Sequence, residues 1–338
     1  MRITRIQNIP IEVPWRERVR SHLARGWQRQ EDPTVGTHIY IVESDEGLTG
    51  YGEGPDLGGL TESFIGHSPF EYVLDDRAGA CQIAFYDLMG QFTGQPLHRL
   101  FGPPVRDRVP IAYWSHCFAP DALAAEAELA LGRGFRLHKI KSRPFETSAD
   151  QVAAMAAVIP ADYRIIVDAN GTWGRPAEAL RIARALQAYP NVWALETPIP
   201  QDHIDGYRFL KSHLDYPIAI HSDTPSVMRA VAEGLCDYFV AEGEWSDKLL
   251  RDCHVAQAAE NREFWVENGL CSGISHAFQM HQAAATSNIY LLITLAFLAD
   301  DDMIVEPMVV EGGTMAVPQS PGLGVSLDMD ALERYRLA

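Results

Sequence analysis

Two lysines and three carboxylates stand at or next to the ends of four successive apolar runs. Lys139 and Lys141 close the first run, and Asp168, Glu196 and Asp223 follow at the ends of the next three. Carboxylate oxygens are the ligands that a hard divalent cation prefers. A lysine beside such a cation can serve as a general base when its pKa is lowered. The spacing therefore predicts a metal site with a base next to it.

The elements that position these residues alternate between strand and helix. Alanine-rich stretches of helical period separate the apolar runs, which is typical of a parallel sheet. Since parallel strands all end at one face, the charged ends of a closed barrel converge on the face where such barrels carry their chemistry. Eight strand candidates match a (β/α)8 barrel, the TIM-type α/β fold, in number and span. They lie at 110–114, 137–141, 164–170, 193–200, 217–223, 238–243, 264–269 and 303–307.

The N-terminal part has a different pattern. Residues 2–13 and 37–44 alternate apolar and polar side chains, and the segment 45–47 is typical of a hairpin turn, so a small antiparallel sheet is predicted. A helix is predicted at 76–91, where apolar residues recur with helical spacing. We therefore expect an α+β unit at 1–105, the barrel at 106–310 and a C-terminal segment at 311–338 that returns to the first unit.

Charge and composition exclude several classes of function. The net charge of −17 argues against binding to nucleic acid phosphates and to anionic membrane surfaces. The five cysteines show no CxxC spacing, so neither a zinc cluster nor a disulfide framework is indicated. No signal-peptide pattern stands at the start, and no apolar run reaches the ~18 residues of a membrane span. We expect a cytoplasmic protein.

Five pieces of the sequence carry a resemblance to a known family. They are IAFYDLMGQFTGQPLHRLFG at 83–102, KxK at 139–141, VDAN at 167–170, ETPIP at 196–200, and VEP at 305–307 with PGLGV at 321–325. In this order they resemble the mandelate racemase and muconate-lactonizing branch of the enolase superfamily over nearly the whole chain. The resemblance implies an N-terminal capping domain over the barrel and a homo-oligomer. It also implies one Mg²⁺ ion and removal of the proton α to a carboxylate through an enediolate, as in acid-sugar dehydratases or racemases and epimerases.

Residue roles follow from the resemblance. Lys141 is expected to be the base, and Lys139 to hold the carboxylate of a small anionic substrate. Because each ammonium disfavours the charge on the other, Lys139 also lowers the pKa of Lys141. Asp168 and Glu196 are expected to bind Mg²⁺. The alternative is that the lysines are exposed on an amphipathic strand, that Asp168 caps a helix and that Glu196 forms a surface ion pair.

The third metal ligand is open between two residues. Alignment with the family places His221 there, whereas the preference of Mg²⁺ for oxygen favours Asp223. Side chains alternate along a strand, so both residues point to the same face and their parity does not decide between them.

The opposite wall of the barrel departs from the family. Relatives place a lysine or an aspartate where this chain has Glu242, and some pair that aspartate with a histidine on the seventh strand. Glu242 is expected to replace the aspartate as a catalytic residue, and Glu267, on the seventh strand, to contact the substrate. A two-base proton transfer is therefore disfavoured. Glu306 resembles the eighth-strand glutamate that hydrogen-bonds the substrate carboxylate, and His116, after the first strand, can reach the cavity.

An arginine-rich loop precedes the second strand of the N-terminal unit. Arg16, Arg18 and Arg20 lie within it, an unusual density of positive charge for so acidic a chain. Such a loop would draw an anionic substrate toward the site. The alternative is a solvated loop without a ligand.

Two other readings of function remain. In the first, the protein is a barrel lyase or hydrolase in which the metal activates water and the lysines only hold an anion. In the second, it is a non-catalytic relative that keeps the fold and binds a small acid.

Overall fold

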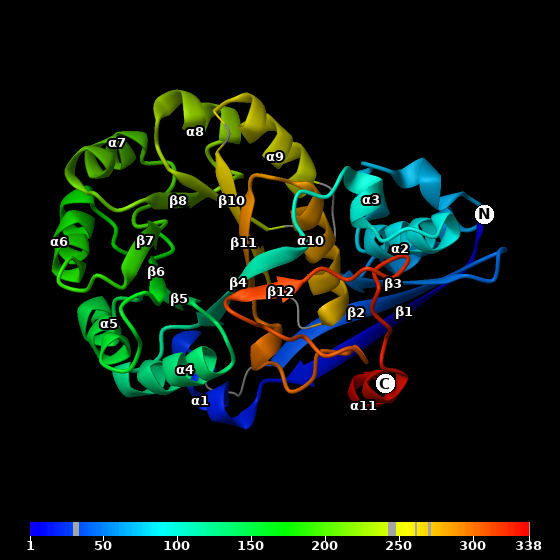
Figure 1. Cartoon of the computed structure of the whole chain (residues 1–338), viewed down its shortest axis with the longest axis horizontal. Coiled ribbons are helices and arrows are strands. Elements are labelled where there is room, and N and C mark those ends of the chain that lie inside the picture. Colours follow the sequence, from blue (N-terminus) through cyan, green and yellow to red (C-terminus); the bar gives the residue numbers. More distant parts are fainter. Residues whose placement is uncertain (30–33, 243–247, 261, 270–271, 338) are drawn as a thin grey trace.

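The computed structural model describes residues 1–29, 34–242, 248–260, 262–269 and 272–337. The N-terminal part forms an antiparallel sheet in the order β1-β2-β3, and helix α2 packs against it (Figure 1). The predicted helix at 76–91 is observed as α2, which begins at Cys81. The elements of this part are β1 (Ile3–Pro14), α1 (Glu17–Gly26), β2 (Thr34–Ser44), β3 (Thr49–Gly54), α2 (Cys81–Thr93) and α3 (His98–Phe101), with 3-10 turns at Gly58–Phe64, Pro69–Tyr72 and Asp76–Ala78.

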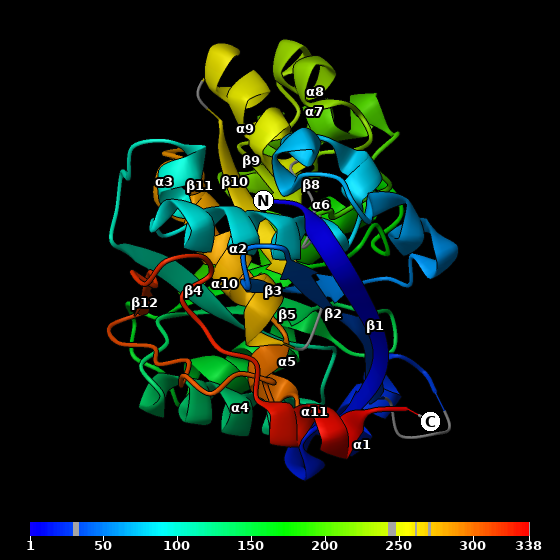
Figure 2. The same ribbon diagram turned by 90° about the vertical axis from the view of Figure 1, so that its right-hand side faces the viewer.

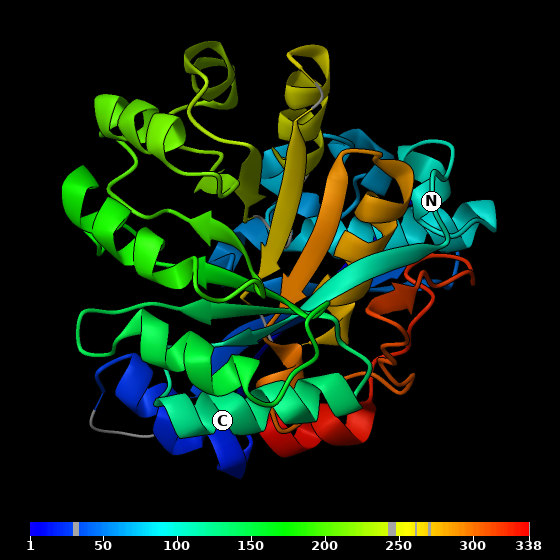
Figure 3. The ribbon, with the colours of Figure 1, turned by 60° about the vertical axis from the view of Figure 1, so that its left-hand side comes forward.

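Eight parallel strands in the described part of the chain close into a barrel (Figure 3). Each strand pairs with the next in the sequence, and β11 pairs with β4 to complete the ring. The predicted TIM-type fold is therefore confirmed. The strands are β4 (Arg108–Ser115), β5 (Leu137–Lys141), β6 (Arg164–Asp168), β7 (Val192–Glu196), β8 (Ile218–His221), β9 (Tyr238–Ala241), β10 (Glu263–Asn268) and β11 (Ile289–Thr294).

The predicted eighth strand at 303–307 is wrong. The eighth strand is β11, whose residues Leu291, Leu292 and Ile293 are buried. A strand buried on both faces has a continuous apolar run, which periodicity cannot distinguish from a buried helix. Residues 303–307 instead leave Val305 exposed and contribute only an isolated bridge at Ile304.

Helices cover the outside of the barrel. Proline occupies the first turn of α4 and of α6, where its missing N–H costs no helical hydrogen bond. Among the described residues, no helix is both long and apolar enough to cross a bilayer. The helices are α4 (Pro120–Gly132), α5 (Ser148–Ala156), α6 (Pro176–Leu186), α7 (Ile204–His213), α8 (Val227–Glu233), α9 (Lys248–Ala258) and α10 (Gly273–Ala285).

The C-terminal segment joins the barrel to the N-terminal sheet. After β11 comes a 3-10 turn (Ala296–Leu298), and β12 (Thr314–Ala316) then pairs antiparallel with β4. Helix α11 (Met329–Tyr335) lies beside β1, and a bridge between Ile11 and Arg336 follows it (Figure 2). Buried Asp87 on α2 accepts hydrogen bonds from the backbone N–H groups of Tyr51 and Leu323, so one side chain connects three segments.

Candidate active site

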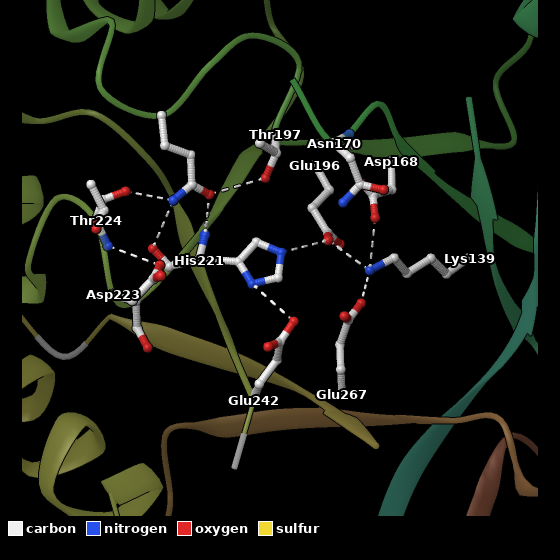
Figure 4. Close-up of polar contacts among 12 residues, drawn as sticks. Lys139, Asp168, Asn170, Glu196, Thr197, His221, Asp223, Thr224, Glu242 and Glu267 are labelled. Carbon is white, nitrogen blue, oxygen red and sulfur yellow. Dashed lines mark hydrogen bonds and ion pairs between the residues drawn. The ribbon is translucent and has the colours of Figure 1, made fainter. Parts of the chain in front are cut away.

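Lys139 lies at the centre of the barrel mouth. Its side chain is fully buried, and its ammonium forms ion pairs with three carboxylates from three other strands (Figure 4). Nζ lies 2.6 Å from Oε1 of Glu196 and 3.1 Å from Oδ2 of Asp168, and it also contacts Glu267. Burial lowers the pKa of Lys139, but Asp168 and Glu196 outweigh that effect and the net shift is upward. The structure therefore keeps this ammonium charged.

Lys141 occupies a different electrostatic environment on the same strand. It lies two residues beyond Lys139, so both side chains point into the mouth. Nζ of Lys141 lies 2.5 Å from Oδ2 of Asp168, and its side chain keeps 11% of its surface exposed. Burial lowers its pKa, Asp168 opposes this and Lys139 adds to it, with a net downward shift. Of the two lysines, Lys141 is the one whose neutral form the site favours.

The carboxylates at the ends of β6 and β7 lie next to each other. Asp168 and Glu196 are paired in the parallel register, and both are fully buried. Oδ1 of Asp168 accepts a hydrogen bond from the backbone N–H of Asn170. Burial raises the pKa of Asp168, but Lys139 and Lys141 outweigh that effect and hold it well below its usual range. Oε2 of Glu196 is buried and accepts no hydrogen bond from the described residues.

The structure brings His221, and not Asp223, to the site. Nε2 of His221 lies 3.6 Å from Oε1 of Glu196, and Nδ1 lies 3.6 Å from Oε1 of Glu242 (Figure 4). Burial lowers the pKa of His221, but Glu196 outweighs that effect and the net shift is upward. Asp223 lies beyond the end of β8, is exposed and accepts a hydrogen bond from the backbone N–H of Thr224.

The residues present fit a divalent cation. Glu196, His221 and Glu267 each offer one ligand atom, and these atoms lie within 4.8 Å of one another. Asp168 adds a further carboxylate beside Glu196. A buried carboxylate oxygen without a hydrogen bond, in a group of three carboxylates, is suited to a cation because leaving it unpaired is costly.

The predicted residues of the opposite wall, Glu242, Glu267 and Glu306, differ in how near they lie to Lys139 and the ligand group. Glu267, at the end of β10, reaches Lys139, whereas Glu242 follows β9 and keeps 65% of its side chain exposed. The interpretation of Glu306 as an eighth-strand residue is wrong, because it belongs to the irregular segment after β11 and accepts hydrogen bonds from the N–H and hydroxyl of Ser326. The eighth strand ends at Thr294.

His116 forms part of an aromatic wall beside the lysines. It follows β4, is buried and packs against Trp27 and Trp114, with ring centroids 5.3 and 5.6 Å away. Nδ1 accepts a hydrogen bond from the backbone N–H of Cys117, which assigns the proton of a neutral ring to Nε2. Burial, with Arg143 and Lys141, lowers the pKa of His116 to about 3. The ring is therefore a neutral hydrogen-bond donor.

The predicted arginines lie on or next to helix α1, and two of them are engaged within the protein. Arg18 contacts Glu126 at 2.7 Å and the hydroxyl of Tyr113 at 2.9 Å, which joins α1 to α4 and β4. Arg20 donates to the carbonyl of Trp15. Nε of Arg16 is buried and donates no hydrogen bond to the described residues.

The sequence reasoning missed Arg143. Its guanidinium donates to Oδ1 of Asn170 at 2.7 Å, and its charge acts on His116, so it lies at the lysine side of the mouth. It lies two residues beyond Lys141, where β5 ends, so strand parity does not place it and the loop after the strand does. Positive charge is therefore present on the same side of the mouth as Lys141.

Comparison with known proteins finds enzymes of this architecture. Residues 122–331 match the family Enolase C-terminal domain-like. The chain is 26% identical over 277 residues to D-gluconate dehydratase of Thermoproteus tenax, a match that covers 76% of this chain and 55% of that relative. It is 30% identical over 267 residues to 3,6-anhydro-alpha-L-galactonate cycloisomerase of Streptomyces coelicolor, covering 75% of this chain and 70% of that relative.

A solved structure agrees with the fold over the full length. N-succinyl Arg/Lys racemase from Bacillus cereus has a TM-score of 0.83 and 21% identity, with 100% of this chain and 99% of that chain covered. At this identity the likeness is one of fold. The chain spans about half the length of the dehydratase that it matches in sequence.

Proposed function

Because the chain belongs to the Enolase C-terminal domain-like family, we propose that it removes the proton α to the carboxylate of a small acid, with Lys141 as the base. The observation that carries this proposal is the contrast between two lysines on one strand. Lys139 is kept charged by three carboxylates, whereas Lys141 has a lowered pKa and a partly exposed side chain. A base must lose its proton before it can accept one, and of the two lysines Lys141 is the one whose lowered pKa favours that loss.

The carboxylates and His221 would hold a divalent cation beside this base. Asp168, Glu196 and His221 occupy the ends of β6, β7 and β8, and Glu267 faces them from β10. Family resemblance implies Mg²⁺. A bound dication would supply positive charge to offset the second negative charge that the substrate carboxylate acquires as the proton leaves. Arg143 and the Nε2–H of His116 would orient the rest of the anion.

The opposite wall offers carboxylates and a histidine but no second lysine, which favours elimination over racemisation. The chain has four lysines, Lys139, Lys141, Lys211 and Lys248. Lys211 is paired with Asp237, and Lys248 with Asp252, outside the described site. An elimination needs one base on one face: the C–H bond breaks as Lys141 takes the proton, a C=C bond forms, and the C–O bond to a β-hydroxyl breaks. The Lys141 ammonium then returns the proton to that leaving oxygen, and water departs.

Solvent exchange tests the proposal. The protein is incubated in D2O with a divalent cation and, separately, D-gluconate, arabinonate and N-succinyl-L-arginine, the acids in the names of its relatives. Deuterium at the α carbon, or loss of water, is followed by mass spectrometry. We expect exchange or dehydration with a hydroxy acid, and a rate at least about 10²-fold lower with Lys141→Ala. Full exchange by Lys141→Ala on the same substrate would exclude Lys141 as the base.

A further inference from the structure

We propose that the cation site is built for a first-row transition-metal dication such as Mn²⁺ or Zn²⁺ rather than for Mg²⁺, with His221 as a nitrogen ligand held in place by Glu242. This inference rests on the proposed function for the existence of a cation site, and it names the class of cofactor. It depends on three features of His221: the direction of each ring nitrogen, the carboxylate next to the ring, and the fact that His221 rather than Asp223 enters the mouth from β8.

The two ring nitrogens of His221 face different partners. Nε2 points toward Glu196, 3.6 Å from Oε1, and belongs to the group in which Glu196, His221 and Glu267 offer ligand atoms within 4.8 Å of one another. The group draws on three different strands, β7, β8 and β10, so barrel closure fixes its geometry. The fully buried Oε2 of Glu196, which accepts no hydrogen bond from the described residues, adds an oxygen that a cation would satisfy.

Glu242 lies next to the ring nitrogen of His221 that does not face the ligand group. Nδ1 of His221 lies 3.6 Å from Oε1 of Glu242, within the range of an ion pair. A histidine that binds a metal through one nitrogen commonly donates its other N–H to a carboxylate, which fixes the tautomer and the ring orientation. The arrangement of Glu242, His221 and the ligand group has this order (Figure 4). It gives Glu242 a role that does not require contact with the substrate.

The choice of nitrogen over oxygen sets the metal preference. Mg²⁺ demands oxygen ligands in near-ideal octahedral geometry, whereas imidazole suits metals such as Fe²⁺ and Zn²⁺, and affinity rises from Mn²⁺ toward Cu²⁺. Asp223, two positions further, carries a carboxylate that could bind Mg²⁺. It lies outside the strand, however, where it is exposed and accepts a hydrogen bond from the backbone N–H of Thr224. The side chain that enters the mouth from β8 is therefore the imidazole.

Calorimetry on metal-free protein tests the preference. Mg²⁺, Mn²⁺ and Zn²⁺ are titrated separately into the wild type, His221→Asp, Glu242→Gln and the matched control His254→Asp, an exposed histidine on α9. We expect the wild type to bind Mn²⁺ and Zn²⁺ at least tenfold more tightly than Mg²⁺ and His221→Asp to reduce this ratio by about tenfold or more. Glu242→Gln should weaken Mn²⁺ binding by about 10- to 100-fold. His254→Asp should leave all three affinities unchanged.

Pulsed electron paramagnetic resonance of bound Mn²⁺ gives a readout independent of affinity. We expect ¹⁴N modulation from the imidazole in the wild type and its loss in His221→Asp, and the wild-type spectrum decides the point even if the variant fails to fold. Mg²⁺ binding as tight as Mn²⁺, or a Mn²⁺ spectrum without ¹⁴N modulation, overturns this inference and leaves proton abstraction with Mg²⁺ intact. If none of the three cations binds at millimolar concentration, both this inference and the metal requirement of the proposed function are overturned. The D2O experiment then still tests whether Lys141 is the base.

Discussion

The two walls of the barrel mouth differ in how tightly their charges are held. The lysine wall, formed by Lys139, Lys141 and Asp168 on β5 and β6, is buried except for the 11% of the Lys141 side chain that stays exposed. Its charges are paired at 2.5 to 3.1 Å. The acidic wall, formed by His221 and Glu242 near the ends of β8 and β9, is partly exposed, and its two residues are separated by 3.6 Å. Buried charges require near-perfect compensation, whereas exposed ones do not.

This difference predicts how each wall responds to substitution. A replacement in the lysine wall leaves a charge without its partner in the interior, which is costly. A replacement of the exposed Glu242 in the acidic wall is screened by water and costs less. We therefore expect substitutions in the lysine wall to affect stability and proton transfer more strongly than substitutions in the acidic wall.

The largest expected effect is the loss of the base from the lysine wall. Lys141→Ala should slow α-proton exchange by about 10²- to 10⁴-fold, because the variant lacks the proposed general base. The measurement is deuterium incorporation at saturating substrate. Glu242→Ala serves as the comparison from the acidic wall and should retain measurable exchange. Equal losses in both variants would remove the distinction between the walls.

The next effect concerns stability rather than rate. Lys139→Met removes the ammonium that three carboxylates share. Because Glu196 and Glu267 lose their lysine partner and Asp168 keeps only Lys141, the free energy of unfolding should fall by about 3–5 kcal/mol. Urea denaturation followed by circular dichroism measures this. Lys211→Met, which breaks the partly exposed pair with Asp237, is the control and should cost no more than about 1 kcal/mol. A neutral result for Lys139→Met would mean that the lysine wall does not depend on this ammonium.

The pH dependence of exchange should report Lys141. Burial and Lys139 lower its pKa below the usual 10.5 against the opposing effect of Asp168, and only the neutral amine accepts a proton. The rate should therefore fall about tenfold per pH unit below this pKa and level off above it. His116, with a pKa near 3, should add no inflection between pH 5 and 8. A rate that rises as the pH falls would require a different base.

The smallest expected effect is on cation affinity, and it distinguishes His221 from Asp223 as the third ligand. Asp223→Ala should change Mn²⁺ affinity by less than about twofold, because an exposed charge outside the ligand group is screened by solvent. Calorimetry on the variant and on Asp202→Ala, which removes another surface charge, provides the comparison. A loss of tenfold or more with Asp223→Ala alone would place Asp223 among the ligands.

Much of the fold followed from local pattern. Apolar runs spaced by helices predicted a parallel barrel, and seven of the eight strand positions overlap observed strands. The predicted resemblance to the enolase superfamily is confirmed by the family match. The eighth strand was missed because β11 is apolar on both faces, so its pattern lacks the alternation that identifies a strand.

The sequence by itself determined that Lys139 and Lys141 enter the mouth together, because side chains alternate along a strand and these two residues share a parity. Parity holds only within a strand, however, and β8 ends at His221, so the backbone turns before Asp223 and carries it outward. Contacts across the ring, such as that between Lys139 on β5 and Glu267 on β10, exist only after the barrel closes. Only the tertiary structure decided these contacts, because the residues are far apart in the chain and no local sequence pattern specifies the distance between them.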